Sequence, residues 1–406
     1  MTTPARRASV TLVCGTLIIA IVLGIRHAFG VFLRPVTIDL SLTRETFALA
    51  IAMQNLIWGL AQPFAGMVAD KFGGGPVIGI GGLIFVAGLL FATVSTDSTG
   101  FYISVGLLVG LGLSATSYAV VLGAIGRAVA PERRSLALGI ATAGGSFGMF
   151  VVVPGSQLLI SGYGWIAALT ILAITAALVP WLATVFARSE QRPEAMLSTQ
   201  SLSGALLEAR QHSGYWLLNA GFFVCGFQTV FIATHLPSFL ADQAISPMVA
   251  AVSLALIGFF NMIGTYLWGL FGDRYRKKYL LSVLYLARAI VIALFIYVPV
   301  SSVSAVVFGA AVGLLWLGTV PLTSGLVAQI FGLRYLATLV GIVFLSHQVG
   351  SFLGGWLGGY VFDVTGSYDL VWLASIALGV AAAILHWPIA DAPLEHARAK
   401  LPAEAT

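Results

Sequence analysis

The stretch Gly66-Met67-Val68-Ala69-Asp70-Lys71-Phe72-Gly73 is a short polar hinge between two long apolar runs. The same pattern recurs in the second half of the chain, again after one apolar run and before the next, as Gly269-Leu270-Phe271-Gly272-Asp273-Arg274-Tyr275-Arg276-Lys277-Lys278. A pattern that recurs at a long period is typical of a fold built from repeated units. The spacing G-x-x-x-D-[RK] at equivalent places therefore predicts two similar halves.

The composition on either side of these hinges is that of a membrane protein. Of the 406 residues, 59% are hydrophobic and 9% are charged, whereas about a quarter of the residues of a soluble domain carry charge. Apolar runs of about 20 residues, the length that crosses a bilayer as a helix, recur along the chain. They are too long and too uniform for the alternating strands of a membrane β-barrel. The predicted spans are residues 11–36, 46–69, 76–95, 100–126, 136–161, 164–187, 214–241, 248–272, 279–299, 302–331, 338–362 and 368–390.

These twelve spans predict an all-α integral membrane protein made of two six-helix bundles with pseudo-twofold symmetry. We expect an N-terminal bundle over residues 1–187 and a C-terminal bundle over residues 214–391. A polar cytoplasmic linker, residues 188–213, joins them and contains a short surface helix from Leu202 to Ala209. A cytoplasmic tail follows over residues 392–406.

The basic residues predict the orientation, because Lys and Arg are retained on the cytoplasmic side. With the N-terminus inside, the basic residues of both hinges, the linker and the ends of the chain fall on the cytoplasmic face, and only Arg34 and Arg44 lie outside. The formal net charge of +5 follows from this topology, and no basic patch interleaved with aromatic residues indicates nucleic acid. Cys14 and Cys225 lie within apolar runs, where packing explains them. We expect no cofactor and no metal.

The repeated G-x-x-x-D-[RK] pattern resembles the signature of the major facilitator superfamily of transporters. In that family this loop latches the two halves on the cytoplasmic side. The resemblance therefore implies gating roles for Asp70 and Lys71 in the first hinge and for Asp273 and Arg274 in the second.

The charges inside the membrane indicate the kind of substrate. Arg26, with His27 beside it, lies midway along the first span, where an ionisable residue is costly and functional by default, although an Arg bonded to backbone carbonyls is the structural alternative. All 15 Asp and Glu residues map to a loop, a tail or the end of a span, so Arg26 and Arg288 have no acidic partner in the membrane. Because a lone buried charge is costly, a transported anion would supply the missing charge. Arg288 lies in a span that usually stands outside the cavity in this family, and a structural role is at least as expected there.

Histidines are the remaining groups for proton transfer inside the membrane. They are His27, His235 and His347, with His386 near the inner end. Their unperturbed pKa lies near neutrality. If a proton is co-transported, one of these histidines or the substrate itself must carry it. For His235, a hydrogen bond to a neighbouring helix is an equal alternative.

Several stretches resemble the bacterial monocarboxylate and oxalate–formate branch of the family. They are Arg26-x-x-Phe29-Gly30-x-Phe32, Phe147 in the glycine-rich fifth span, and the run from His347-Gln348-x-Gly350 to Asp363-x-x-Gly366-x-Tyr368. Members of this branch carry small organic anions such as lactate, pyruvate, formate or oxalate. The resemblance implies that Arg26 or His27 handles the carboxylate, that Tyr118 contacts the substrate and that Asn261 supplies a polar group.

One position departs from that branch, since an Arg commonly follows the polar residue of the eighth span by one turn and Thr265 stands there. Either Arg26 has taken over this role, or the substrate is not a simple monocarboxylate.

We therefore expect a secondary transporter of a small organic anion in the bacterial cytoplasmic membrane, with both termini in the cytoplasm. Arg26 would anchor the anion by charge-assisted hydrogen bonds, and Tyr118, Asn261, Trp316 and His347 would shape the rest of the pocket. Proton symport, exchange and uniport all remain open. An efflux carrier for amphipathic, mainly apolar compounds is the main alternative, and a non-transporting membrane receptor is another. The sequence holds no nucleophile–base or metal-ligand pattern that would indicate an enzyme.

Overall fold

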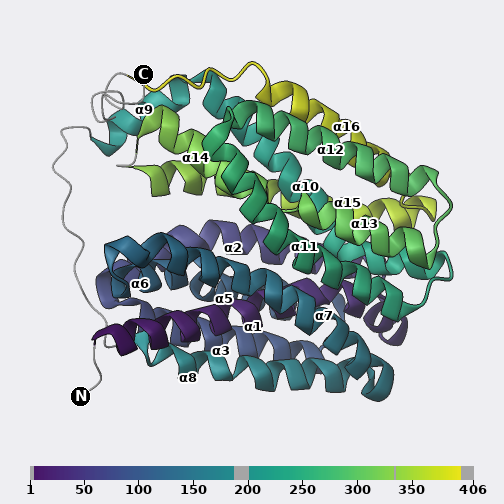
Figure 1. Cartoon of the computed structure of the whole chain (residues 1–406). Helices are drawn as coiled ribbons and strands as arrows, with labels where there is room; N and C mark the ends of the chain where they lie inside the picture. The colour runs from purple at the N-terminus through teal and green to yellow at the C-terminus, as the bar shows by residue number, and fades with distance from the viewer. Residues whose placement is uncertain (1–3, 187–200, 333–334, 395–406) are drawn as a thin grey trace.

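The computed structural model describes residues 4–186, 201–332 and 335–394, and every regular element in this part of the chain is helical. The first half contributes nine elements (Figure 1). They are α1 (Pro4–Asp39), α2 (Arg44–Phe72), α3 (Gly74–Val94), α4 (Ser98–Phe101), the π-helix η1 (Tyr102–Leu108), α5 (Val109–Thr116), α6 (Tyr118–Ala128), α7 (Pro131–Ala176) and α8 (Leu178–Ala183).

The second half begins with a short helix at the surface and continues with seven longer ones. They are α9 (Leu202–Gln211), α10 (Ser213–Asp242), α11 (Pro247–Arg274), α12 (Lys277–Tyr297), α13 (Ser302–Leu314), α14 (Thr319–Phe331), α15 (Leu336–Thr365) and α16 (Asp369–His386). The short helix α9 confirms the one predicted over residues 202–209. The rest of the predicted linker, residues 188–200, and most of the predicted tail lie outside the described residues.

Within the described residues, eleven apolar segments are long enough to cross a membrane. The longest, Leu136–Ala183, contains the predicted span 136–161 and most of the predicted span 164–187. They are joined at Gly164, whose φ of +80° interrupts the helical angles of α7. Glycine adopts such an angle without steric cost, so the chain turns there and starts its sixth span. All twelve predicted spans are thus represented.

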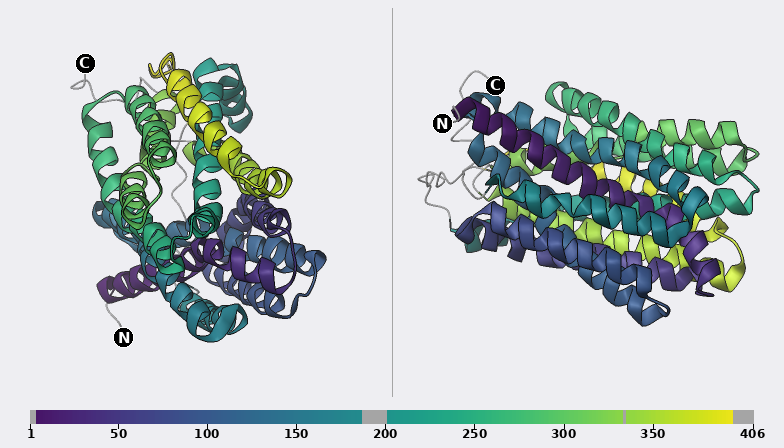
Figure 2. Two further views of the ribbon diagram at one scale, coloured as in Figure 1. Left: turned by 90° about the vertical axis from the view of Figure 1, so that its right-hand side faces the viewer. Right: turned by 90° about the horizontal axis from the view of Figure 1, so that it is seen from below.

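The two halves form two bundles that lie side by side, as the end-on view of Figure 2 also shows. Between the bundles α2 packs along α15, α7 packs along α11, and α1 contacts α10. The ribbons meet at the end that carries the α1–α2 connection and diverge towards the end where α1 begins (Figure 1). The contact of α1 with α10 is close at Gly30, where an added β-carbon would collide with the carbonyl of Ala233. Small residues permit such approaches between membrane helices.

The fourth helix of each half is interrupted, and the sequence analysis treats both spans as continuous. In the first half Ser117, between α5 and α6, has extended backbone angles of φ −93° and ψ −164°. In the second half, residues 315–318 separate α13 from α14. A helix end leaves backbone groups without intrahelical partners, and inside a membrane other parts of the protein must satisfy them. The two interruptions place Tyr118 and Trp316 next to helix ends inside the protein.

Candidate functional site

Arg26 on α1 is surrounded by neutral partners. Its Nη2 donates to Oδ1 of Asn55 on α2 at 2.6 Å, and its guanidinium lies over the ring of Trp58, 5.1 Å from the ring centre. In the described part of the chain, the ion pairs all involve other residues. The positive charge of Arg26 is therefore hydrogen-bonded but not neutralised by a carboxylate.

His27 supplies a further neutral contact to Arg26. Its Nδ1 lies 2.7 Å from the carbonyl oxygen of Leu23, which can only accept, so Nδ1 carries the hydrogen. In the neutral ring Nε2 is then an acceptor, and Nη1 of Arg26 donates to it at 3.1 Å. In this arrangement His27 orients the guanidinium and adds no charge.

A small cavity opens beside Arg26 at the junction of α1, α2 and α10. Its lining residues are Arg26, His27, Phe29, Gly30, Ile51, Gln54, Val230, Ala233 and Thr234. Gln54 is 0% exposed, and neither its amide oxygen nor its amide nitrogen has a hydrogen-bond partner. The Nε of Arg26 is also without a partner. The cavity thus combines one unneutralised cation with one unsatisfied amide.

Gln54 and Asn55 are not among the predicted site residues. The available signal is their position, since this pair of adjacent amide residues lies in the first half of the mainly apolar second span, residues 46–69. A search for charged residues passes over them because both side chains are neutral.

His347 on α15 lies near this cavity but does not line it. Its ring stacks on Phe344, with ring centres 5.9 Å apart, and Phe344 packs edge-on against Trp58 of the other bundle at 5.6 Å. The neighbouring Gln348 donates to the backbone oxygen of Asn55 at 2.8 Å. Arg26 is therefore linked to His347 across the α2–α15 interface through Trp58 and Phe344.

Tyr118 lies at the start of α6, within electrostatic reach of Arg26. The interruption before it is held by Trp58, whose Nε1 donates to Oγ of Ser117 at 2.8 Å. One tryptophan thus contacts both the guanidinium of Arg26 and the broken fourth helix of the same bundle.

Asn261 and Trp316 lie apart from the cavity that contains Arg26. Both polar atoms of the Asn261 amide have partners, because it donates to Oγ of Ser146 on α7 at 2.8 Å and accepts from the backbone of Leu317 at 2.9 Å and from Thr265 at 3.1 Å. Trp316 is 2% exposed within the interrupted fourth helix of the second bundle. The cavity at Arg26 therefore gathers Arg26 and His27 from the six predicted binding residues, with Tyr118 and His347 nearby.

Arg288 on α12 binds the interruption between α13 and α14. Its Nη2 donates to the backbone oxygens of Leu315 and Trp316, the latter at 2.7 Å, and its Nη1 donates to Oε1 of Gln228 at 3.2 Å. A basic side chain stabilises the free carbonyls at a helix C-terminus. These contacts favour the structural alternative for Arg288.

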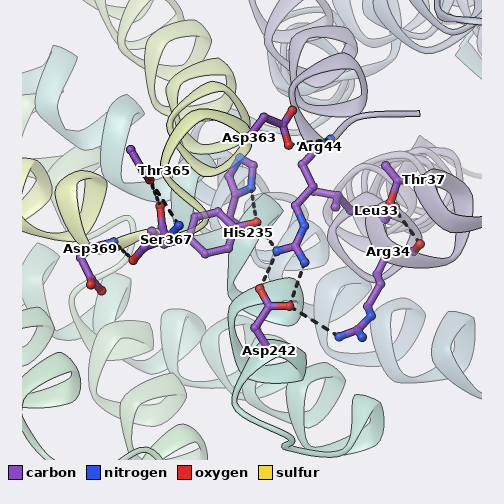
Figure 3. A network of polar contacts seen from close by, with 11 residues as sticks. Leu33, Arg34, Thr37, Arg44, His235, Asp242, Asp363, Thr365, Ser367 and Asp369 are labelled. Atoms are coloured by element: carbon purple, nitrogen blue, oxygen red, sulfur yellow. Dashed lines mark hydrogen bonds and ion pairs between the residues drawn. The ribbon is translucent and has the colours of Figure 1, made fainter. Parts of the chain in front are cut away.

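Polar contacts also join the two bundles at the end that the predicted orientation places outside (Figure 3). Arg44, at the start of α2, donates from Nη1 and Nη2 to the carboxylate of Asp242 at 2.6 and 2.8 Å. Its Nη1 also donates to the hydroxyl of Tyr368 at 3.0 Å. We refer to Arg44, Asp242, Asp363 and Tyr368 as the outer latch.

Asp363, near the end of α15, completes the first turn of α2 from the other bundle. Its carboxylate accepts from the backbone N–H of Arg44 at 3.3 Å and from that of Glu45 at 2.7 Å. Such N–H groups have no partner within their own helix, and a carboxylate there interacts favourably with the helix dipole. The N-terminus of α2 is therefore capped across the bundle interface.

The hydroxyl of Tyr368 connects the latch to His235. The Nε2 of His235 lies 2.8 Å from the carbonyl oxygen of Gly355, so Nε2 carries the hydrogen and Nδ1 accepts from Tyr368 at 3.4 Å. His235 thus bonds neighbouring helices, one of the two roles considered for it.

At the opposite end the predicted gating residues make a different kind of contact. Asp70 pairs with Arg127 of the same bundle at 3.1 Å. Lys71, Asp273 and Arg274 are exposed. In this conformation the hinge residues do not bridge the bundles through any ion pair that the described residues form.

The described ion pairs that cross between the bundles all involve Asp242, which lies 2.6 Å from Arg44 and 3.7 Å from Arg34. The sequence analysis places Arg34 and Arg44 as the only basic residues outside but assigns them no role. Two basic residues on the side where such residues are rare are the signal that could have identified the outer latch.

A third ion-paired group lies within the second bundle, after the end of α16. Asp391 accepts from Arg276 at 3.1 and 2.5 Å and lies 3.8 Å from Nζ of Lys278. Hydrogen bonding to Arg276 lowers the pKa of Asp391 below its ordinary value.

Comparisons with known proteins agree with this architecture. The sequence profile described as the Major Facilitator Superfamily matches residues 11–324 and 245–405. The chain is 26% identical over 358 residues to "Monocarboxylate transporter 13" of Rattus norvegicus, covering 86% of this chain and 81% of the relative. It is 27% identical over 382 residues to an uncharacterized MFS-type transporter of Bacillus subtilis, covering 90% and 91%. It is 23% identical over 354 residues to "Oxalate:formate antiporter" of Oxalobacter formigenes, covering 86% and 83%.

Among solved structures, the chain is similar to a bacterial homolog of the human lysosomal transporter Spinster in an inward-facing and occupied conformation. The TM-score is 0.76 at 17% identity, over 95% of this chain and 97% of that one. At this identity the similarity concerns the fold.

Proposed function

The chain belongs to the major facilitator superfamily, a family of transporters rather than enzymes, and on this premise we propose that it carries a small, monocarboxylate-like organic anion across the membrane. The observation that supports this substrate class is Arg26, whose partly buried guanidinium has only neutral partners. The printed names of several relatives, which are monocarboxylate transporters and an oxalate:formate antiporter, agree with it.

Arg26 is suited to be the anion anchor. A charge removed from water is costly unless an opposite charge pairs with it, and a carboxylate matches the planar fork of a guanidinium by accepting two hydrogen bonds. The unpartnered Nε of Arg26 provides a donor for the incoming group. Anion binding would therefore neutralise the site.

His27 offers a route for coupling the anion to a proton. Its Nε2 accepts from Arg26 in this conformation. A carboxylate that takes over Nη1 of Arg26 would release that acceptor, and Nε2 could then bind a proton next to the new negative charge. In this proposal one anion and one proton bind together, with His27 as the proton carrier.

Transport would proceed by alternating access of the two bundles around a central site. The outer latch would hold the outer end closed in the conformation described here, and release of the latch would open the site to the outside. Asp70, Lys71, Asp273 and Arg274 would act at the inner end, closing it when the outer end opens. The protein is a multi-pass integral membrane protein, and we propose the bacterial inner membrane as its location, with both termini in the cytoplasm.

Ligand-induced stabilisation of the purified protein tests this function, because binding to the folded state raises its apparent stability. We expect small monocarboxylates to raise the unfolding temperature of the wild type but not of Arg26→Gln. Arg6→Gln is the matched control, since Arg6 is also on α1 but is exposed and lies outside the cavity. Stabilisation confined to cationic or neutral amphiphiles would contradict the proposal and favour an efflux carrier.

A further inference from the structure

Gln54 contributes an unsatisfied amide group to the lining of the cavity at Arg26. The side chain is 0% exposed, and both atoms of its amide group lack a hydrogen-bond partner among the described residues. A buried polar group without a partner destabilises a folded protein, and most buried amides are satisfied. An amide that lines a cavity in this condition is positioned to bond to whatever occupies the cavity.

The charges around the cavity restrict the occupant. Arg26 is the one basic residue among the lining residues apart from His27, whose hydrogen bonds are those of a neutral ring. The site therefore offers charge compensation for one carboxylate and no second cation for another. Gln54 provides one acceptor and two donor hydrogens, which match a hydroxyl group that both donates and accepts.

We propose that Gln54 is a specificity-determining residue that binds a hydroxyl substituent of the transported anion. The preferred substrate is then a small hydroxy-monocarboxylate whose carboxylate contacts Arg26 and whose hydroxyl contacts Gln54. This inference rests on the proposed function, since it assumes an anion at Arg26. It excludes a dicarboxylate as the preferred substrate, because a second negative charge would face the neutral amide.

Pairs of acids that differ by a single hydroxyl test the proposal. Glycolate and acetate form one pair, and lactate and propionate form another. Uptake and competition would be measured with the full-length protein in proteoliposomes, for the wild type and for Gln54→Leu. Gln157→Leu is the matched control, because Gln157 is a buried glutamine outside the cavity.

We expect the wild type to prefer the hydroxy acid of each pair by about tenfold, the scale of one or two neutral hydrogen bonds. In Gln54→Leu this preference falls to nearly equal uptake, while Gln157→Leu keeps it. The unfolding temperature without ligand gives a second measurement. Because Gln54→Leu removes an unsatisfied amide, we expect that temperature to stay level or rise, whereas a structural role for the amide would lower it.

The outcomes separate this inference from the function on which it rests. Equal uptake of both acids by the wild type, or an unchanged preference in Gln54→Leu, overturns the role of Gln54 and leaves anion transport standing. A wild type that neither binds nor transports any of the four acids overturns the proposed function itself. A loss of unliganded stability in Gln54→Leu also overturns the inference, because it identifies a structural partner for the amide.

Discussion

Arg44 of the first bundle donates two hydrogen bonds to the carboxylate of Asp242 in the second, at 2.6 and 2.8 Å. Both residues follow a predicted outer end of a span, and at the other end of α2 Asp70 pairs within its own bundle. The same helix thus forms an ion pair with the second bundle through its first residue and with its own bundle through its last turn. An ion pair that crosses the interface at one end only is expected in a carrier that closes one side at a time.

Reversing the charges of this pair tests its role as a latch. We expect Arg44→Asp and Asp242→Arg, each alone, to shift the protein towards conformations with a separated outer end by about tenfold, the scale of a hydrogen bond to a charged group. The double variant should restore the wild-type distribution. Spin labels on cysteines introduced at the exposed Ser41 and Gln243 report the distance between the bundles. A double variant no closer to the wild type than the single ones would contradict direct pairing.

Removing the cap that Asp363 provides to α2 should also shift the protein towards conformations with a separated outer end. Asp363→Ala removes the acceptor of two backbone N–H groups, and loss of a helix cap costs about 0.5–2 kcal/mol. Because the acceptor belongs to the other bundle, this energy is lost only from the closed outer end, and the same spin-label distance should lengthen. Asp369→Ala is the control, since Asp369 is exposed in the first turn of α16 and caps no part of α2. An Asp363→Ala variant with an unchanged distance distribution would show that the cap does not bias the conformations.

His27→Gln tests the proposed proton carrier. Glutamine can still accept from Arg26 but cannot take up a proton near neutral pH, so we expect anion binding to persist while uptake loses its dependence on external pH. In the wild type uptake should fall as external pH rises, because fewer protons accompany the anion. Proteoliposome uptake over about 1 pH unit on either side of the ordinary histidine pKa of about 6.5 measures both curves. Parallel curves for the two proteins would remove His27 from the coupling.

Asp391 predicts how stability depends on acid. Its pKa is lower in the folded protein than its ordinary value because Arg276 donates to the carboxylate. A group of this kind stabilises the fold above its unfolded pKa of about 3.9 and loses that contribution as pH falls through the lower folded value. We expect Asp391→Asn to lower the unfolding temperature at neutral pH, with the difference from the wild type shrinking once the pH falls below about 3.9. A difference that is constant across this pH range would assign the effect to packing.

The sequence predicts the fold well because the membrane imposes simple rules on it. Long apolar runs mark the spans, and Gly164 lies where one run must turn into the next. The interruptions at Ser117 and at residues 315–318 are not predicted, although Ser114, Thr116 and Ser117 lie at the first and Pro321 follows the second. Their free backbone and side-chain groups are satisfied by distant residues, Trp58 in one case and Arg288 in the other.

The candidate site is predictable only in part for a similar reason. Arg26 is identified from the sequence because a charge in an apolar span is costly whatever surrounds it. Gln54 carries no charge, and its significance depends on the absence of partners, which only the packed structure reveals. Predicting the outer latch likewise requires knowing which loops meet across the bundle interface. The pattern of basic residues identifies only Arg34 and Arg44 in the first bundle and not their acidic partner in the second.

Anion uptake by Arg26→Gln in proteoliposomes tests the central claim most directly. The measurement compares lactate counterflow in the wild type, in Arg26→Gln and in the control Arg6→Gln, with the same amount of folded protein in each preparation. We predict that Arg26→Gln loses counterflow by at least about tenfold, since one charged hydrogen-bonded contact is removed, and that Arg6→Gln retains it. Full counterflow in Arg26→Gln would contradict the account and show that this guanidinium is structural.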